Sequence, residues 1–130
     1  MNGKGYLLDT NIVIALFANE DSVVKPLSQA EMVYIPGIVI GELFYGAFKS
    51  VRVDDNLQRI QEFASHNVIL ECSVQTPYYY GEIKNQLRIK GHPIPENDLW
   101  IAAIAIQHHL TLVSRDKHFK EIASLRLTEW

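Results

Sequence analysis

A run of eight apolar residues at positions 99–106 constrains the fold of this chain more than any other part of its sequence. The polar residues Glu96, Asn97 and Asp98 precede the run, as is common at a helix N-terminus. A helix that is apolar on every side has to be buried on every side, so other layers of structure must enclose it. The run is far shorter than the roughly 18 apolar residues that cross a bilayer. We therefore predict a buried helix and no membrane span.

Short apolar stretches alternate with helix-forming segments along the rest of the chain. Such alternation is typical of a parallel sheet that lies between layers of helices. We predict an α/β protein, an αβα sandwich with a central, mainly parallel sheet of four or five short strands, folded as one domain over residues 1–130. The predicted strands are residues 6–8, 32–35, 67–72, 111–113 and a short one near 126–127, and the predicted helices are residues 12–18, 23–30, 38–48, 53–65, 74–90 and 96–109.

Cysteine content and the N-terminal sequence bear on the cellular compartment. Cys72 is the only cysteine in the sequence, so the chain forms no internal disulfide and does not need an oxidising compartment. Asp9 and Asn11 interrupt the N-terminal apolar stretch, which stays apolar in a secretory signal peptide. We expect a cytoplasmic protein, with Cys72 buried at the end of a strand.

The net charge does not favour a simple nucleic-acid-binding domain. Twelve Lys and Arg residues against fifteen Asp and Glu residues give a formal charge of −3 with neutral histidines, whereas nucleic-acid-binding domains are usually basic. Two bound divalent cations would add four charges and bring the sum from −3 to +1. Net charge alone therefore does not exclude a nucleic-acid substrate.

Four acidic residues adjoin segments that we expect to be buried: Asp9, Glu42, Asp98 and Asp116. Asp9 and Asp116 follow predicted strands, and the carboxyl ends of parallel strands share the ligand-binding edge of a sheet. Asp98 lies in the first turn of the buried helix, where the helix dipole favours negative charge. Four oxygen ligands without nearby CxxC or HxxxH spacing suit Mg²⁺ or Mn²⁺ better than zinc. The hypothesis that follows is a phosphodiesterase in which a bound ion activates water.

Each of these acids also has a purely structural interpretation when it is taken alone. Asp9 and Asp98 suit helix N-termini as capping residues. Glu42 suits the solvated flank of a helix, and Asp116 suits a turn. Their expected convergence at one end of the sandwich is what favours a joint role.

Three other functions remain open from the residues alone. Asp9 at a strand end could be the nucleophile of a haloacid-dehalogenase-like phosphatase, although position 11, where that chemistry usually has a second Asp, is Asn. An acidic pocket could instead hold a basic partner peptide without catalysis. A metal-free ribonuclease needs paired imidazoles, but the adjacent His108 and His109 point about 100° apart on a helix and suit its end better. A dinucleotide-binding fold is poorly supported, because no GxGxxG follows the first strand.

Four short motifs occur in order along the chain: LLDTN at 7–11, GELFYG at 41–46, NDLWIAA at 97–103 and LVSRD at 112–116. Together they resemble the PIN-domain family, and most closely the VapC-like ribonuclease toxins of type II toxin–antitoxin pairs. Each motif is short, but the ordered set spans nearly the whole chain. The resemblance implies an αβα sandwich whose acidic pocket binds Mg²⁺ or Mn²⁺ and hydrolyses RNA to leave 5′-phosphate and 3′-hydroxyl ends.

The resemblance also assigns roles to individual residues. Asp9, Glu42, Asp98 and Asp116 match the four acidic positions of the family's pocket. Asp9, Asp98 and Asp116 are expected to hold the metal, while Glu42 completes the pocket or positions the attacking water. The neighbouring polar residues expected to orient these ligands or bound water are Thr10, Asn11, Asn97 and Ser114.

Partners are implied by the same resemblance. We expect a homodimer that is silenced by a small antitoxin, whose tail covers the acidic pocket and which alone contacts DNA. The three tyrosines at 78–80 suit the dimer interface. Arg115 and Lys117 flank Asp116 and are the residues we expect at RNA phosphates.

Overall fold

Five strands, six α-helices and one 3₁₀ helix make up residues 5–130, the part of the chain that the computed structural model describes. The strands are β1 (Gly5–Leu8), β2 (Met32–Pro36), β3 (Val68–Leu70), β4 (Thr111–Val113) and β5 (Leu127–Thr128). The helices are α1 (Thr10–Phe17), α2 (Asp21–Gln29), α3 (Gly37–Phe48), α4 (Val53–Ser65), α5 (Thr76–Lys90), α6 (Glu96–Gln107) and the 3₁₀ helix η1 (Lys117–Glu121).

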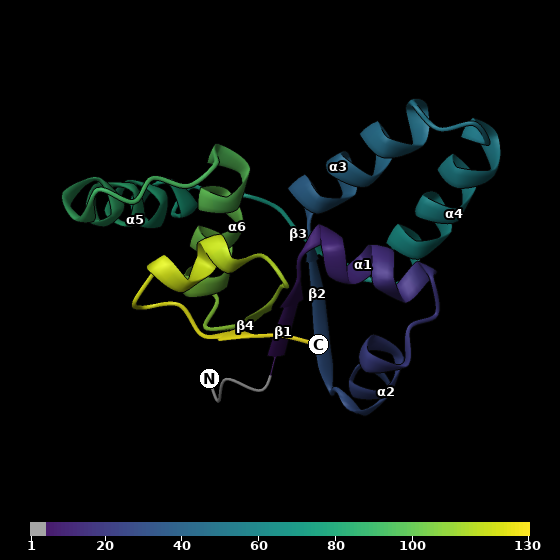
Figure 1. Cartoon of the computed structure of the whole chain (residues 1–130), viewed down its shortest axis with the longest axis horizontal. Helices are drawn as coiled ribbons and strands as arrows, with labels where there is room; N and C mark the ends of the chain where they lie inside the picture. The colour runs from purple at the N-terminus through teal and green to yellow at the C-terminus, as the bar shows by residue number, and fades with distance from the viewer. Residues whose placement is uncertain (1–4) are drawn as a thin grey trace.

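All five strands are parallel and form one sheet in the order β3-β2-β1-β4-β5. The chain runs from β1 through β2 to β3 and then crosses back to β4, on the other side of β1. Because such crossovers are right-handed, the reversal puts α1 to α4 on one face of the sheet and α5 and α6 on the other, as Figure 1 shows. The predicted αβα sandwich is confirmed.

The strand order changes direction beside β1, since β2 and β3 lie on one side of it and β4 and β5 on the other. In such sheets, ligands bind at this place. In open α/β sheets this place is the crevice at the carboxyl ends of the two strands that diverge, here β1 and β4. Leu8 and Val113 are paired across these strands, and the backbone N–H of Asp9 donates to the carbonyl of Val113 at 3.0 Å. Asp9 and Ser114, the next residues along each strand, therefore meet at this crevice.

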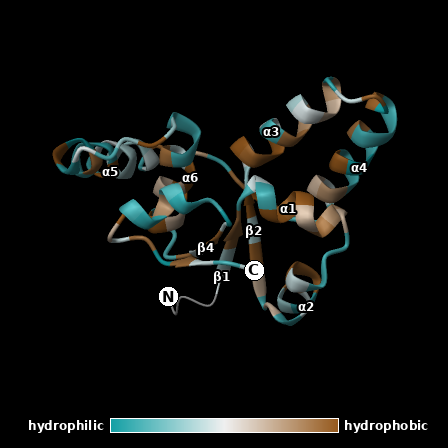
Figure 2. Ribbon diagram, in the orientation of Figure 1, coloured by the Kyte–Doolittle hydropathy of each residue, from teal (hydrophilic) through white to brown (hydrophobic). Residues whose placement is uncertain are grey.

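Helix α6 lies mostly in the hydrophobic core, although it is not buried on every side as predicted, because Trp100 and Ile106 are only half-buried. Leu99 and all five residues at 101–105 are buried, and α6 packs against α5, α3 and β4. Three of these residues are alanines, whose small side chains let neighbouring elements approach closely. Hydrophobic residues also dominate β1 and β2, whereas the outer surfaces of α2 and α4 are more hydrophilic (Figure 2). Within residues 5–130, every helix is too short or too polar to qualify as a membrane span.

Four helix ends differ from the prediction by two residues: the starts of α1, α2 and α5 and the end of α6. Helix α1 begins at Thr10 rather than at residue 12, because the Asp9 side chain caps it. Helix α5 begins at Thr76 rather than at residue 74, after a turn in which the Ser73 N–H donates to the Thr76 hydroxyl at 2.8 Å. Gly91 ends α5 as predicted, with a φ of 76° that a glycine adopts without strain.

The expectation that Cys72 is buried is wrong. Strand β3 is only three residues long and ends at Leu70, at the edge of the sheet. Cys72 lies in the segment that leads to α5, where its side chain is exposed. The predicted strand therefore extends two residues beyond the end of β3.

Truncation of an enclosed α6 side chain tests this packing. Ile104 is 1% exposed, so its replacement by alanine leaves a cavity in the core. We expect Ile104→Ala to lower the free energy of unfolding by about 2–5 kcal/mol. The control Ile89→Ala, at a side chain 70% exposed on α5, should change it by less than about 0.5 kcal/mol. Urea denaturation measures both, and a loss below about 1 kcal/mol at Ile104 would contradict close packing of α6.

Candidate active site

Asp9 is held at the crevice by contacts from both strands. It is the N-cap of α1, and its Oδ1 accepts a hydrogen bond from the N–H of Thr10 at 2.9 Å. Its Oδ2 accepts a hydrogen bond from the hydroxyl of Ser114 at 2.7 Å. With 5% exposure, Asp9 is a buried carboxylate whose orientation is set by the ends of β1 and β4.

Asn11 and Ser114 connect the two strand ends. The Asn11 amide lies 3.4 Å from Asp9 Oδ2, and its Oδ1 accepts from the N–H of Arg115 at 3.1 Å. The Ser114 hydroxyl oxygen accepts from the N–H of Asp116 at 3.0 Å. These polar side chains thus contact two of the predicted acids, Asp9 and Asp116.

Glu42 joins the site from α3, on the opposite face of the sheet from α6. The Thr10 hydroxyl donates to one oxygen of its carboxylate, and the Asn97 amide donates to the other at 3.3 Å. Asn97 belongs to the first turn of α6. The site therefore spans both helix layers, and Thr10 and Asn97 hold Glu42 between them.

Asp98 and Asp116 are brought together by a histidine that the sequence-based prediction did not include. His118 Nδ1 lies 3.2 Å from Asp98 Oδ2 and 3.0 Å from Asp116 Oδ1. The Asp116 side chain also caps η1, since its Oδ1 accepts from the N–H of His118 at 3.0 Å. The available signal was the Asp-x-His spacing directly after β4, which puts both side chains in one turn.

Burial and repulsion between carboxylates raise the pKa of Asp9 and of Asp98. Burial is the main cause that raises the pKa of Asp9, and the charges of Glu42 and Asp116 raise it further. Burial also raises the pKa of Asp98, and Asp9 and Asp116 add to that effect. Hydrogen bonds to both carboxylates oppose these shifts without cancelling them. The carboxylates thus lie close enough to repel one another, an arrangement that a divalent cation stabilises.

The chemistry of the donor atoms suits such a cation. Within residues 5–130, one oxygen each from Asp98 and Asp116 and a ring nitrogen of His118 all lie within 4.8 Å of one another. Asp9 and Glu42 are not part of this trio, but Asp9 lies close enough to Glu42, Asp98 and Asp116 for their charges to interact. Carboxylate oxygens are the ligands that Mg²⁺ and Mn²⁺ prefer in proteins.

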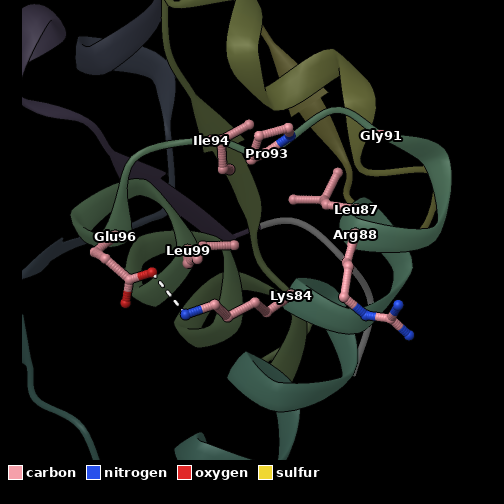
Figure 3. A pocket seen from close by; sticks show the side chains of 8 residues that line it. All are labelled: Lys84, Leu87, Arg88, Gly91, Pro93, Ile94, Glu96 and Leu99. Carbon is pink, nitrogen blue, oxygen red and sulfur yellow. Dashed lines mark hydrogen bonds and ion pairs between the residues drawn. The ribbon is translucent and has the colours of Figure 1, made fainter.

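A mainly apolar cavity lies away from this cluster. It measures about 370 Å³ and is bounded by α5, α6 and the segment between them (Figure 3). Lys84 and Glu96 form an ion pair of 3.0 Å at its mouth, and none of the four predicted acids lines it. Smaller cavities adjoin the acids on two sides, one of about 200 Å³ beside Thr10 and Glu42 and one of about 290 Å³ beside Ser114 and Asp116. Substrate-sized space is therefore open next to the carboxylates.

The two residues predicted at RNA phosphates lie in different environments. The Arg115 guanidinium contacts Glu20 at 3.0 Å and the carbonyl of Trp130 at 3.0 Å. It therefore ties α2 and the C-terminal residue to the end of β4. Lys117 is exposed and lines the cavity beside Asp116.

Comparison of the sequence with known proteins identifies the family of this chain. A sequence profile described as PIN domain matches residues 6–125. The chain belongs to the PIN-domain family. The resemblance expected from the four ordered motifs is thereby confirmed.

Relatives of this PIN domain match it along almost their whole length. Ribonuclease VapC2 from Rickettsia felis is 38% identical over 130 residues, which cover 96% of this chain and 97% of that protein. The tRNA(fMet)-specific endonuclease VapC from Shigella flexneri is 31% identical over 129 residues, with the same coverage. The crystal structure of VapBC2 from Rickettsia felis bound to a DNA fragment from their promoter has a TM-score of 0.89 at 37% identity, and covers 97% of this chain and 98% of that one.

Removal of one charge from the PIN-domain cluster should stabilise the ion-free protein. The Asp98 side chain is only 14% exposed, and because burial raises its pKa, its ionised form opposes folding. The stability that accompanies the protonated form is present below the ordinary aspartate pKa of about 4 and is lost as the pH rises through the raised pKa. We therefore expect Asp98→Asn to be more stable than the wild type at pH 7, by roughly 1 kcal/mol, with a gain that shrinks towards pH 4.

Thermal unfolding in a buffer with a chelator, at several pH values, measures this gain. The exposed residue Glu82 on α5 provides a control, because Glu82→Gln removes the same charge outside the cluster. The control should follow the wild type across the pH range. An Asp98→Asn protein that is less stable than the wild type at pH 7 would contradict the repulsion argument.

Proposed function

We propose that this protein is a metal-dependent endoribonuclease that acts as the toxin of a type II toxin–antitoxin pair. The observation that carries the proposal is the convergence of four carboxylates at the crevice between β1 and β4 of a PIN domain. Support comes also from relatives along almost the full length whose names are ribonuclease VapC2 and tRNA(fMet)-specific endonuclease VapC. RNA is the proposed substrate class.

Asp9, Asp98 and Asp116 would hold Mg²⁺ or Mn²⁺, and Glu42 would complete the pocket. When bound, such an ion polarises a phosphodiester and lowers the pKa of a water molecule. Ser114 keeps Asp9 in one orientation through its hydrogen bond of 2.7 Å. Glu42, held from both sides, has the position to orient the attacking water. Hydrolysis in this manner leaves 5′-phosphate and 3′-hydroxyl ends.

The proposed partners follow from the complexes known for similar proteins. VapBC2 from Rickettsia felis was crystallised with a fragment of promoter DNA. We propose that a cognate antitoxin covers the acidic pocket of this protein and contacts DNA on behalf of the pair. Tyr78, which is 69% exposed on α5, is a candidate contact between two copies in a homodimer. We place the reaction in the cytoplasm.

The phosphatase alternative receives no support from the geometry. A carboxylate nucleophile needs an accessible oxygen, but Asp9 is 5% exposed and both of its oxygens accept hydrogen bonds. The remaining alternative, an acidic pocket that only binds a basic peptide, predicts a protein that binds its partner but cleaves no RNA.

Sequencing of new 5′-phosphate RNA ends after brief expression in cells tests the proposal. Wild type, Asp98→Asn and the control Glu82→Gln are compared at matched protein levels. We expect a few sharp cleavage sites with the wild type and the control. Their yield should fall by more than about 100-fold with Asp98→Asn, beyond the loss typical for residues that only orient a metal ligand. Identical ends in all three samples, from folded protein free of antitoxin, would favour the binding-only alternative.

Arg115 and Lys117 allow a test of the RNA-binding surface. Since Lys117 is exposed beside the pocket, Lys117→Ala should weaken RNA binding for all sequences, reduce the salt dependence of affinity by about one unit of slope, and leave stability unchanged. Arg115→Ala should lower stability by about 1–3 kcal/mol, because it removes charge-assisted hydrogen bonds to Glu20 and Trp130. Binding and unfolding measurements on both variants check the contrast, and equal RNA affinity of Lys117→Ala and wild type would exclude Lys117 as a phosphate contact.

A further inference from the structure

We propose that His118 is itself a ligand of the divalent cation, so that the site has a mixed oxygen and nitrogen donor set and prefers Mn²⁺ to Mg²⁺. The inference rests on the proposed metal-dependent nuclease. It adds to the four acids a residue of different chemistry, contributed by η1. The consequence is a preference among metals that carboxylates alone would not produce.

The ring nitrogen lies at ligand spacing from two proposed ligands. His118 Nδ1 is 3.2 Å from Asp98 Oδ2 and 3.0 Å from Asp116 Oδ1. In an octahedral site with bonds of about 2.1 Å, neighbouring ligand atoms are about 3.0 Å apart. His118 Nδ1, contributed by η1, therefore already has the separation of an adjacent ligand from one oxygen of Asp98 and from one oxygen of Asp116. All three atoms lie within 4.8 Å of one another.

The backbone of η1 keeps the ring in this place. The N–H of His118 is fixed by the Asp116 carboxylate that caps η1, and the next residue, Phe119, is fully buried in the core. The His118 side chain itself is 50% exposed. A neutral ring can therefore carry its proton on Nε2, with water as the partner, and offer the lone pair of Nδ1 to a cation.

The donor set decides which cations bind well. Mg²⁺ prefers oxygen ligands, whereas an imidazole nitrogen favours transition-metal ions, whose affinities rise from Mn²⁺ onwards along the first row. Within residues 5–130, the trio of Asp98, Asp116 and His118 is the one group of this kind that combines carboxylates with a histidine. A ring that merely pairs with the two carboxylates would instead be displaced by any cation, and would confer no preference.

Pulsed electron paramagnetic resonance on the purified full chain loaded with Mn²⁺ distinguishes these two cases. Coupling of the Mn²⁺ electron spin to an imidazole ¹⁴N nucleus is expected in the wild type and should be lost in His118→Gln. His92 is a matched control, because it is also exposed and lies near a single carboxylate, with Nδ1 4.0 Å from Glu121. His92→Gln should keep the coupling. Circular dichroism verifies that both variants are folded.

Competition between the two ions gives a second, independent readout. The excess of Mg²⁺ needed to displace Mn²⁺ should fall by about tenfold or more in His118→Gln and stay unchanged in His92→Gln. Nitrogen coupling absent from the wild type, or an unchanged competition ratio in His118→Gln, would overturn the role of His118. If the wild type still binds Mn²⁺ and Asp98→Asn does not, the proposed nuclease site survives that result. A wild type that binds neither ion would overturn both proposals.

Discussion

Burial of most of the apolar surface of α6 is the constraint on which the rest of the structure depends. The helix packs mainly against α5, and also against β4 of the sheet and against α3. This packing directs the first turn of α6 towards the crevice between β1 and β4. Asn97 and Asp98 reach the pocket because the hydrophobic residues behind them have only one buried place to occupy. The position of the acidic cluster is thus a consequence of burial.

The pocket brings negative charges together in a partly buried place, where ionised carboxylates lower the stability of the fold. Short polar side chains at the strand ends, chiefly Ser114, Asn11 and Thr10, hold the carboxylates apart from apolar neighbours and fix their directions. Such local conflicts with folding are typical of functional sites, where stability is given up for a prearranged set of ligands. A core with α6 at its centre can tolerate that loss.

Much of this architecture was predictable because its signals are local. The alternation of apolar stretches indicates the order of strands and helices, and the rule that parallel strands end at one edge brings Asp9 and Asp116 together. Other features depend on tertiary contacts that no spacing reveals. The direction of the His118 ring follows from the turn of η1, the engagement of Arg115 follows from the position of Trp130, and the exposure of Cys72 follows from the early end of an edge strand.

The short side chain of Asp9 makes two structural contacts at once. It caps α1 through an N–H only one residue away, and it turns its other oxygen to Ser114 across the crevice. Both contacts depend on the single methylene between the carboxylate and the backbone. Glutamate has the same charge but a longer arm, which would move the carboxylate away from the cap. Over evolutionary time, side-chain length as well as charge should therefore limit which residues position 9 accepts. Position 42 has a different requirement, because the Glu42 carboxylate has to extend far enough to accept hydrogen bonds from Thr10 and Asn97.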